Sequence, residues 1–332
     1  MNAKKIFLCI LAPFIVVGCK KTPFFYRPIT ESEIAGVQAI WEDRDLKARN
    51  VGIIEESKYA NYRVIVFTYE ISGSTRFGLV AIPDMAGKTE LPVALINYDF
   101  ILRNQKYSPK NVIKWAGTDM FGVPSPLKGF LLVFPAYRGQ TLNFDGRIVK
   151  AEGDVFDAFD GAADDAISIL NVAEEYVPEG QYEKIFVMGH GRGGSVSLLL
   201  ASRDSRINTV FATAASVNFY KYEVQDLYSD EFYKYLFKNN SGMESRKRIL
   251  ASSPVYWPVL ANVKNMYLIY GAEDMAVPIW NMGEIFTHLS NQKARTYVNV
   301  IKGTNHFTLE DHYEYSRDLR KAVRQFLINK AK

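Results

Sequence analysis

Three loops of this chain carry the residue types that could do covalent chemistry. They are Gly189-His190-Gly191-Arg192-Gly193-Gly194, Gly271-Ala272-Glu273-Asp274 and Gly303-Thr304-Asn305-His306. Each loop directly follows a short apolar run that is typical of a buried strand. The carboxyl ends of parallel strands meet at one edge of a sheet, so we expect the three loops to converge. A strand-to-helix bend, then an acid, then a histidine is one of the known chain orders of a catalytic triad.

The first loop has the layout of a nucleophile elbow, in which a strand bends sharply into a helix around the motif G-x-S-x-G. Ile185 to Met188 is the expected strand, and Ser195 to Ala201 is the expected helix. The central position holds Gly191, which has no oxygen or sulfur with which to attack a substrate. Glycine also relieves the backbone strain of such a bend, which costs other residues roughly 1–3 kcal/mol. We therefore predict a stable protein whose catalysis is impaired.

Two other interpretations of this loop are open. Ser195 could replace the missing nucleophile, but it lies inside the expected helix, one turn from the bend, which favours a packing role. Residues 189–194 also match G-x-G-x-x-G, the dinucleotide-binding fingerprint. The next expected strand, residues 209–214, is followed by Ala215-Ser216 and lacks the acid that would bind a ribose. We therefore expect no cofactor.

The elements that position these loops alternate along the chain. The expected buried strands are residues 92–96, 130–134, 185–188, 209–214, 266–270 and 296–301. The expected helices are residues 109–116, 154–176, 195–201, 278–289 and 313–329. Strands that alternate with helices predict an α/β fold with a mostly parallel, doubly wound sheet. Residues 62–71 and 75–82 read as an antiparallel hairpin that extends one edge, preceded by a helix at 34–43 and a charged loop to residue 60.

One aromatic-rich segment, residues 217–250, interrupts the alternation. We predict a small helical cap there, over the carboxyl edge of the sheet, within a single domain of residues 31–332. Its aromatic side chains are expected to form core rather than a ligand platform.

The remaining polar candidates are given structural roles. His190 is expected to pack behind the bend, and His288 and His312 are expected on the surface. Asp164 and Asp165 are expected to orient helix and loop contacts.

From about Tyr62 to the C-terminus, several short motifs occur in a recognisable order. They are Leu91-Pro92-Val93, Tyr137-Arg138-Gly139, GHGRGG at 189–194, Ser253-Pro254, GAEDMAVP at 271–278 and GTNHF at 303–307. In this series the chain resembles an α/β hydrolase of the prolyl-oligopeptidase or dienelactone-hydrolase type. The resemblance implies an α/β-hydrolase fold, with Asp274 as the acid that orients the base and His306 as that base. It also makes the backbone amides of Arg192 and Tyr98 candidates for the oxyanion hole.

Two departures from the family pattern bear on activity. Family members read G-H-S-R-G-G where this chain has Gly191. The usual His-Gly-Gly after the first parallel strand is replaced by Asn97-Tyr98-Asp99-Phe100, and Asp99 has the wrong charge to stabilise an oxyanion. The first hypothesis is a catalytically impaired relative of serine peptidases and esterases that binds a peptide or acyl ligand. The alternatives are an active hydrolase with a non-standard nucleophile and a dinucleotide-binding protein.

The N-terminus reads as a targeting segment. Lys4 and Lys5 precede an apolar run, residues 6–17, that is too short for a bilayer span of roughly 20 residues. Val16-Val17-Gly18-Cys19 resembles a bacterial lipobox, although an ordinary secretory signal is the alternative. We expect a signal peptide at 1–18, lipidation of Cys19, a tether at 19–30 and a location in the bacterial cell envelope.

Composition excludes several classes of function. The 332 residues carry 40 Lys and Arg against 36 Asp and Glu, a formal charge of +4 without clustering that would indicate nucleic acid. Four histidines and two cysteines are too few and too scattered for a structural zinc site, so no metal is expected.

Overall fold

The computed structural model describes residues 27–85, 90–98, 113, 119–120, 123–144, 147–155, 157, 159–221, 224 and 232–330. Several features predicted from the sequence lie wholly or partly outside these ranges. They are the signal peptide at 1–18, Cys19 and the tether up to residue 26, Asp99, the helix at 109–116 apart from residue 113, and residues 222–223 and 225–231 of the cap. Within the described part, no helix is long and apolar enough to span a bilayer.

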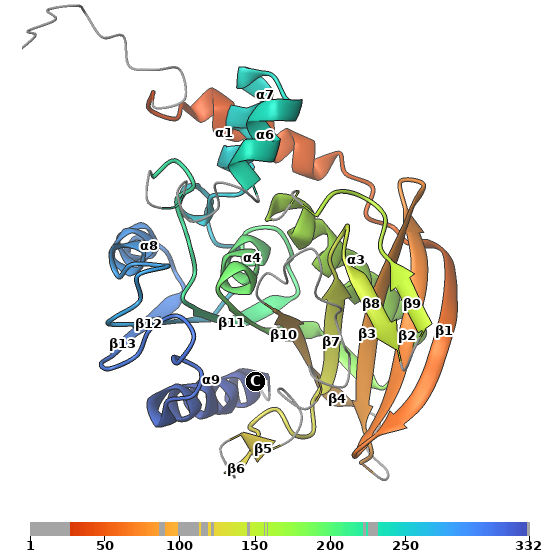
Figure 1. Ribbon diagram of the computed structural model, residues 1–332. Helices are drawn as coiled ribbons and strands as arrows, with labels where there is room; N and C mark the ends of the chain where they lie inside the picture. The colour runs from red at the N-terminus through yellow and green to blue at the C-terminus, as the bar shows by residue number, and fades with distance from the viewer. Residues whose placement is uncertain are drawn as a thin grey trace, which may run out of the picture.

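A nine-stranded sheet forms the centre of the described part (Figure 1). Its strands, in spatial order, are β1 (Arg49–Tyr59), β2 (Tyr62–Ile71), β3 (Ser74–Pro83), β7 (Leu131–Ala136), β4 (Leu91–Asn97), β10 (Gly180–His190), β11 (Ile207–Thr213), β12 (Asn265–Gly271) and β13 (Arg295–Ile301). β1, β2, β3 and β7 pair antiparallel, and every pairing from β7 to β13 is parallel. The predicted doubly wound sheet with an antiparallel edge is confirmed.

Helices cover both faces of this sheet. The helices are α1 (Glu31–Glu42), α3 (Asp160–Tyr176), α4 (Arg192–Leu200), α6 (Lys234–Asn239), α7 (Gly242–Ala251), α8 (Trp280–Ser290) and α9 (Tyr313–Lys330), with a short 3-10 turn at Pro254–Tyr256. Residues of α3, α4 and α8 share one hydrophobic cluster, and residues of α9 belong to a second cluster on the other face. Two small hairpins complete the fold: β5 (Asp119–Met120) with β6 (Val123–Pro124), and β8 (Thr141–Phe144) with β9 (Arg147–Lys150).

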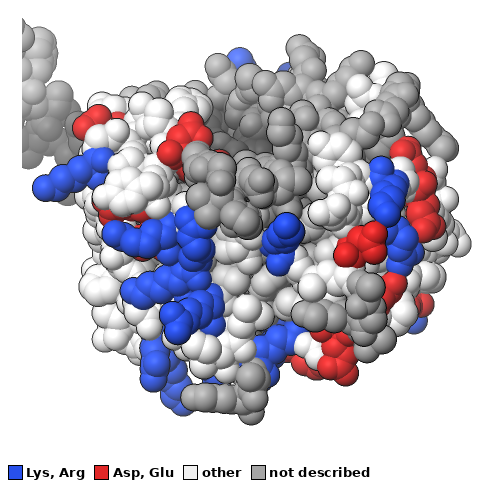
Figure 2. All heavy atoms as spheres, turned by 90° about the horizontal axis from the view of Figure 1, so that it is seen from below, with Lys and Arg blue, Asp and Glu red and all other residues white. Residues whose placement is uncertain are grey.

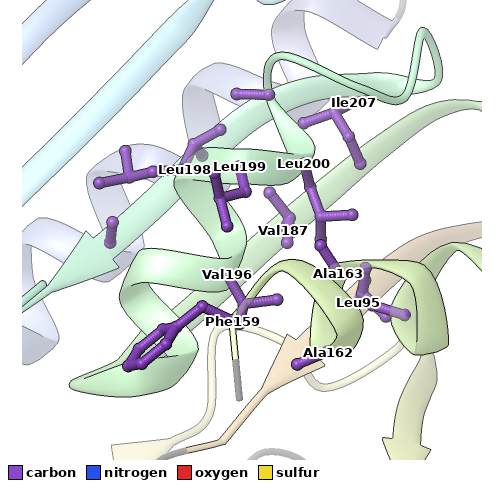
Figure 3. Close-up of a cluster of buried hydrophobic side chains, with 14 of the residues drawn as sticks. Leu95, Phe159, Ala162, Ala163, Val187, Val196, Leu198, Leu199, Leu200 and Ile207 are labelled. Carbon is purple, nitrogen blue, oxygen red and sulfur yellow. The ribbon is translucent and has the colours of Figure 1, made fainter. Parts of the chain in front are cut away.

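The helix that begins at the bend, α4, is held in the first cluster. Figure 3 shows Val196, Leu199 and Leu200 of α4 packed among side chains of β4, β10 and α3. All three side chains are fully buried. Every residue of α4, including Arg192 and two serines, is buried, so the helix lies in the interior of the protein. This packing fixes where α4 begins, and therefore fixes the bend itself.

Two boundaries differ from the prediction. Residues 49–59, expected as a charged loop, form the edge strand β1, whose side chains are mostly exposed. An edge strand pairs on one side only and commonly carries charged side chains, so its composition resembles that of a loop. The long helix expected from residue 154 begins at Asp160, because residues before it form turns and an ion pair.

A buried network of ion pairs surrounds the first turns of α3. It comprises Asp157, Asp160, Asp164, Asp165, Arg44, Arg76, Arg138 and Arg203. Asp165 accepts hydrogen bonds from Arg76 of β3 and from both the backbone and the guanidinium of Arg138, at 2.7–3.1 Å for the shortest contacts. The expectation that Asp164 and Asp165 orient helix and loop contacts matches this arrangement.

We predict that Asp165→Ala destabilises the protein by about 3–5 kcal/mol, because it leaves the buried Arg76 guanidinium without its carboxylate and removes one of the carboxylates that pair with Arg138. The free energy of unfolding, measured by denaturant titration, checks this. The control is Asp84→Ala, which removes the exposed pair with Lys58 and is expected to cost less than about 1 kcal/mol. Equal effects of the two substitutions would contradict the prediction.

Candidate active site

The bend between β10 and α4 has the backbone geometry of an elbow. Gly191 has φ 53° and ψ −119°, a left-handed conformation that glycine adopts more readily than other residues. Its N–H donates to the carbonyl of Thr213, at the end of β11, at 2.9 Å. A Cβ atom on Gly193 would lie 2.1 Å from the carbonyl oxygen of Asn97, so glycine is required where α4 approaches β4.

The acid and the histidine lie together at the same edge of the sheet. Asp274 follows β12, His306 follows β13, and Nδ1 of His306 lies 3.1 Å from Oδ2 of Asp274. A carboxylate only accepts hydrogen bonds, so Nδ1 carries the proton. The backbone N–H of Val277 donates to Oδ1 of Asp274 at 2.7 Å and holds the carboxylate in place. The structure therefore brings together an oriented acid–histidine pair.

His190 connects this pair to the bend. Its ring centroid lies 4.7 Å from that of His306, and its Nδ1 lies 3.0 Å from the hydroxyl of Thr213. Because His190 directly precedes Gly191, the histidine base lies beside the elbow. The sequence predicted only that His190 packs behind the bend. Its contact with His306 joins residues 116 positions apart, and no local motif indicates it.

The oxyanion-hole candidates lie on facing segments. Arg192 is the first residue of α4, and Tyr98 follows the last residue of β4. The Cβ position of Gly193 is 2.7 Å from the carbonyl oxygen of Tyr98, which brings the two segments into contact. The side chains of Arg192 and Tyr98 both contact Tyr137. The rings of Tyr98 and Tyr137 are stacked with their centroids 4.6 Å apart, and the guanidinium of Arg192 lies 4.7 Å from the Tyr137 ring centroid.

The serines nearest the bend have structural roles. Ser195 is fully buried and donates to the carbonyl of Ser216 at 2.7 Å. Ser197 donates to the carbonyl of Gly193 at 2.8 Å and accepts from the amide of Asn97 at 3.0 Å. The predicted packing role of Ser195 agrees with this arrangement.

The first and third glycines of the fingerprint pack against backbone atoms. Their Cβ positions lie 2.2 Å from the carbonyl oxygen of Gly193, for Gly189, and 2.8 Å from that of Thr213, for Gly194. The glycine that lets a pyrophosphate approach the backbone in a dinucleotide site is the second one, which here is Gly191 at the bend. Among the described residues, no group of three or more His, Cys, Asp or Glu side chains could hold a metal ion.

The described part of the predicted cap at 217–250 contains the helices α6 and α7. Phe232, Tyr233 and Leu236 are buried, and Phe232 packs against Phe159 and Phe219 at ring distances of 5.4 and 5.8 Å. These aromatic residues form core, as expected. His288 and His312, which the sequence predicts on the surface, are both half-buried. Nε2 of His288 lies 2.8 Å from the carbonyl oxygen of Trp257.

Helix α1 joins the cap to the body. Glu33 of α1 forms a 2.5 Å ion pair with Arg246 of α7, whose guanidinium also donates to the carbonyls of Arg27 and Pro28. At its other end, Trp41 donates to Asp160 of α3 at 2.8 Å. A cavity of about 190 Å³ lies between α1, α3 and α7 and is lined by side chains of both charges.

A larger cavity lies away from the three loops. It has a volume of about 550 Å³ and is lined by residues from the ends of β1, β2 and β3. Two of its cations, Arg63 and Lys58, form ion pairs with Glu179 and Asp84, which also line it. None of the candidate catalytic residues lines this cavity.

Comparison with known proteins identifies the family. Residues 157–332, more than half of the chain, match the prolyl oligopeptidase family. The chain belongs to the prolyl oligopeptidase family. The matched region contains the elbow, Asp274 and His306. No curated protein matches the chain.

Solved structures share the fold of this family member at low sequence identity. Acetyl xylan esterase 1 from Thermoanaerobacterium sp. JW/SL YS485 is 14% identical, with a TM-score of 0.61 over 90% of this chain and 95% of the esterase chain. The acetyl xylan esterase from Paenibacillus sp. R4 is 17% identical, with the same TM-score over 90% and 97%. The acylaminoacyl peptidase from Pyrococcus horikoshii is 16% identical, with a TM-score of 0.53 over 81% of this chain and 41% of the peptidase. These similarities establish an α/β-hydrolase fold.

The ion pair between α1 and the cap predicts a pH dependence. The hydrogen bond from Arg246 lowers the pKa of Glu33 from 4.5 to about 2. A lowered pKa in the folded state stabilises the protein fully above pH 4.5, and this contribution is lost as the pH falls toward 2. We predict that Glu33→Gln lowers the Tm at pH 7 and that the difference from the native protein shrinks at pH 3. Thermal unfolding of Glu31→Gln, which changes an exposed acid in the same helical turn, is the control. A difference that is independent of pH would contradict this prediction.

Proposed function

We propose that this protein is a lipid-anchored, exported member of the prolyl oligopeptidase family whose catalysis is impaired and which binds a peptide or acyl ligand. One observation carries the proposal. Gly191 occupies the elbow position beside an oriented Asp274–His306 pair. The base, His306, is therefore held in place, but the elbow residue has no side chain that could attack a substrate. Acyl transfer by this family type requires a nucleophilic oxygen at that position.

The energetic consequence is large. When a triad member is removed from a working enzyme, the residual acceleration is about 10³–10⁴-fold over water, supplied by the oxyanion hole and by binding. Ser195 and Ser197 cannot readily substitute, because both are buried and donate to backbone carbonyls. This arrangement favours impaired catalysis over an active hydrolase with a different serine.

The proposed location follows from the N-terminal sequence. Residues 1–18 have the composition of a signal peptide, and Cys19 follows a lipobox-like segment. A lipid at Cys19 would hold the folded part against a membrane of the bacterial cell envelope through residues 19–30. The last part of this tether, Arg27 and Pro28, contacts Arg246 of the cap.

The absence of a serine nucleophile is tested with a fluorophosphonate probe. We predict that the full-length chain shows no covalent labelling under conditions that label an active serine hydrolase completely. Mass spectrometry of the intact protein is the measurement. Labelling of any serine would overturn the proposal and support the non-standard nucleophile.

Gly191→Ser tests whether the acid–histidine pair is a remnant of a triad. We predict that it hydrolyses p-nitrophenyl acetate at least about tenfold faster than Gly191→Ala, since only the serine offers a nucleophile to His306. Both variants are expected to lose roughly 1–3 kcal/mol of stability, because a Cβ is strained at this φ and ψ. Equal rates in the two variants would contradict the assignment of Asp274 and His306 as a competent pair.

A further inference from the structure

Two exposed apolar side chains adjoin the acid–histidine pair. Among the residues that the structure describes, Met275 and Phe307 are the most exposed large hydrophobic side chains, at 89% and 84%. Met275 directly follows Asp274, and Phe307 directly follows His306. Single exposed apolar residues are common on protein surfaces and need no explanation. Here the two most exposed cases each adjoin, in sequence, one partner of the same hydrogen bond.

The loops that carry these two side chains are joined by hydrogen bonds. The N–H groups of Ala272 and Glu273 donate to the carbonyls of Ile301 and Thr304, at 3.0 and 2.9 Å, and His306 bonds to Asp274. We call the two exposed side chains, Met275 and Phe307, the apolar lip.

The two loops that carry the apolar lip have more acidic than basic side chains, and we call these acidic side chains its margin. Glu273 and Asp311 are exposed, and Glu310 is half-buried, whereas Lys302 is the exposed cation of these two loops. The molecule carries basic surface elsewhere: Figure 2 shows Lys and Arg side chains gathered on the side where α9 lies. The negative charge at the lip is therefore a local property that does not follow from the composition of the whole chain.

We propose that the apolar lip binds a polypeptide segment of a partner protein in which large apolar side chains alternate with lysine or arginine. This inference rests on the proposed function, since the segment must be retained rather than cleaved. Methionine adapts its shape to different apolar groups, and aromatic side chains provide large contact areas at interfaces. Glu273 and Asp311 would attract the cations that flank the apolar side chains.

The charge of the margin favours a polypeptide over a lipid surface. Bacterial and cytoplasmic-leaflet bilayers that carry anionic headgroups attract basic protein segments. An acidic margin repels such headgroups, and it also repels the carboxylate of a free fatty acid. A basic peptide satisfies both the apolar lip and its margin.

The experiment uses the full-length chain and a fluorescein-labelled hexapeptide in which phenylalanine and leucine alternate with lysine. Fluorescence anisotropy gives its Kd. We expect Met275→Ser with Phe307→Ser to weaken binding at least about tenfold, in line with loss of two interface anchors. The control is Leu327→Ser with Ile328→Ser, which changes side chains of α9 that are 43% and 44% exposed. This control is expected to leave the Kd unchanged.

Two further arms test the charge and the type of ligand. A peptide with glutamate in place of each lysine is expected to bind at least about tenfold more weakly. The double substitution Glu273→Gln with Asp311→Asn is expected to weaken binding of the lysine peptide and to reduce the dependence of its Kd on salt. Equal binding by the lip variant and the control, or binding of anionic phospholipid vesicles that depends on Met275 and Phe307, would overturn the inference. Mass spectrometry of the recovered peptide separates the two proposals. Cleavage of the peptide would overturn the proposed function. An intact peptide whose Kd is unchanged by the substitutions at Met275 and Phe307 would overturn only this inference.

Discussion

The buried carboxylates at the start of α3 are the interaction that joins the largest number of distant segments of the fold. Asp165 holds the segment after β7 through Arg138 and holds β3 through Arg76. Asp160 and Asp164 hold α1 through Arg44. Buried charges are tolerated only when they are paired and hydrogen-bonded, so these segments are constrained to meet at one place. These ion pairs therefore fix β3, the segment after β7 and the segment after α1 to the start of α3.

The elbow depends on a second constraint, which is steric. The Cβ positions of Gly189, Gly193 and Gly194 are all occupied by backbone atoms of neighbouring segments. The bend can therefore be this tight only with glycine at these three positions. Position 191 is different. A residue with a side chain there would have a strained backbone conformation, but the bend does not require glycine at this position. The elbow architecture and the identity of residue 191 are separable, which is why the family fold persists with Gly191.

Much of the fold could be predicted from the sequence, and the reasons are physical. The central parallel strands are continuous apolar runs between glycine-rich loops, so their period and boundaries are visible in the chain. β1 was missed because an edge strand with exposed, charged side chains lacks that pattern. The predicted start of α3 lies six residues too early, because its first turns are held by ion pairs with residues that are 43 and 116 positions away in the chain.

The site could be predicted only in part, for the same reason. Asp274 and His306 follow strands, and strand ends converge in any parallel sheet. Their chain positions therefore sufficed to predict that they would lie at one edge. The approach of His190 to His306 and the contact of Tyr98 with Tyr137 depend on side-chain packing between distant segments. No periodicity or spacing in the chain encodes such contacts.

The attachment of α1 has a mechanical consequence. The first described residues, Arg27 and Pro28, contact Arg246 of the cap before the chain reaches any strand of the sheet. Glu33 then binds the same guanidinium, and Trp41 binds the body at Asp160. Tension applied at the N-terminus would thus load the cap first and the sheet only after these contacts had broken.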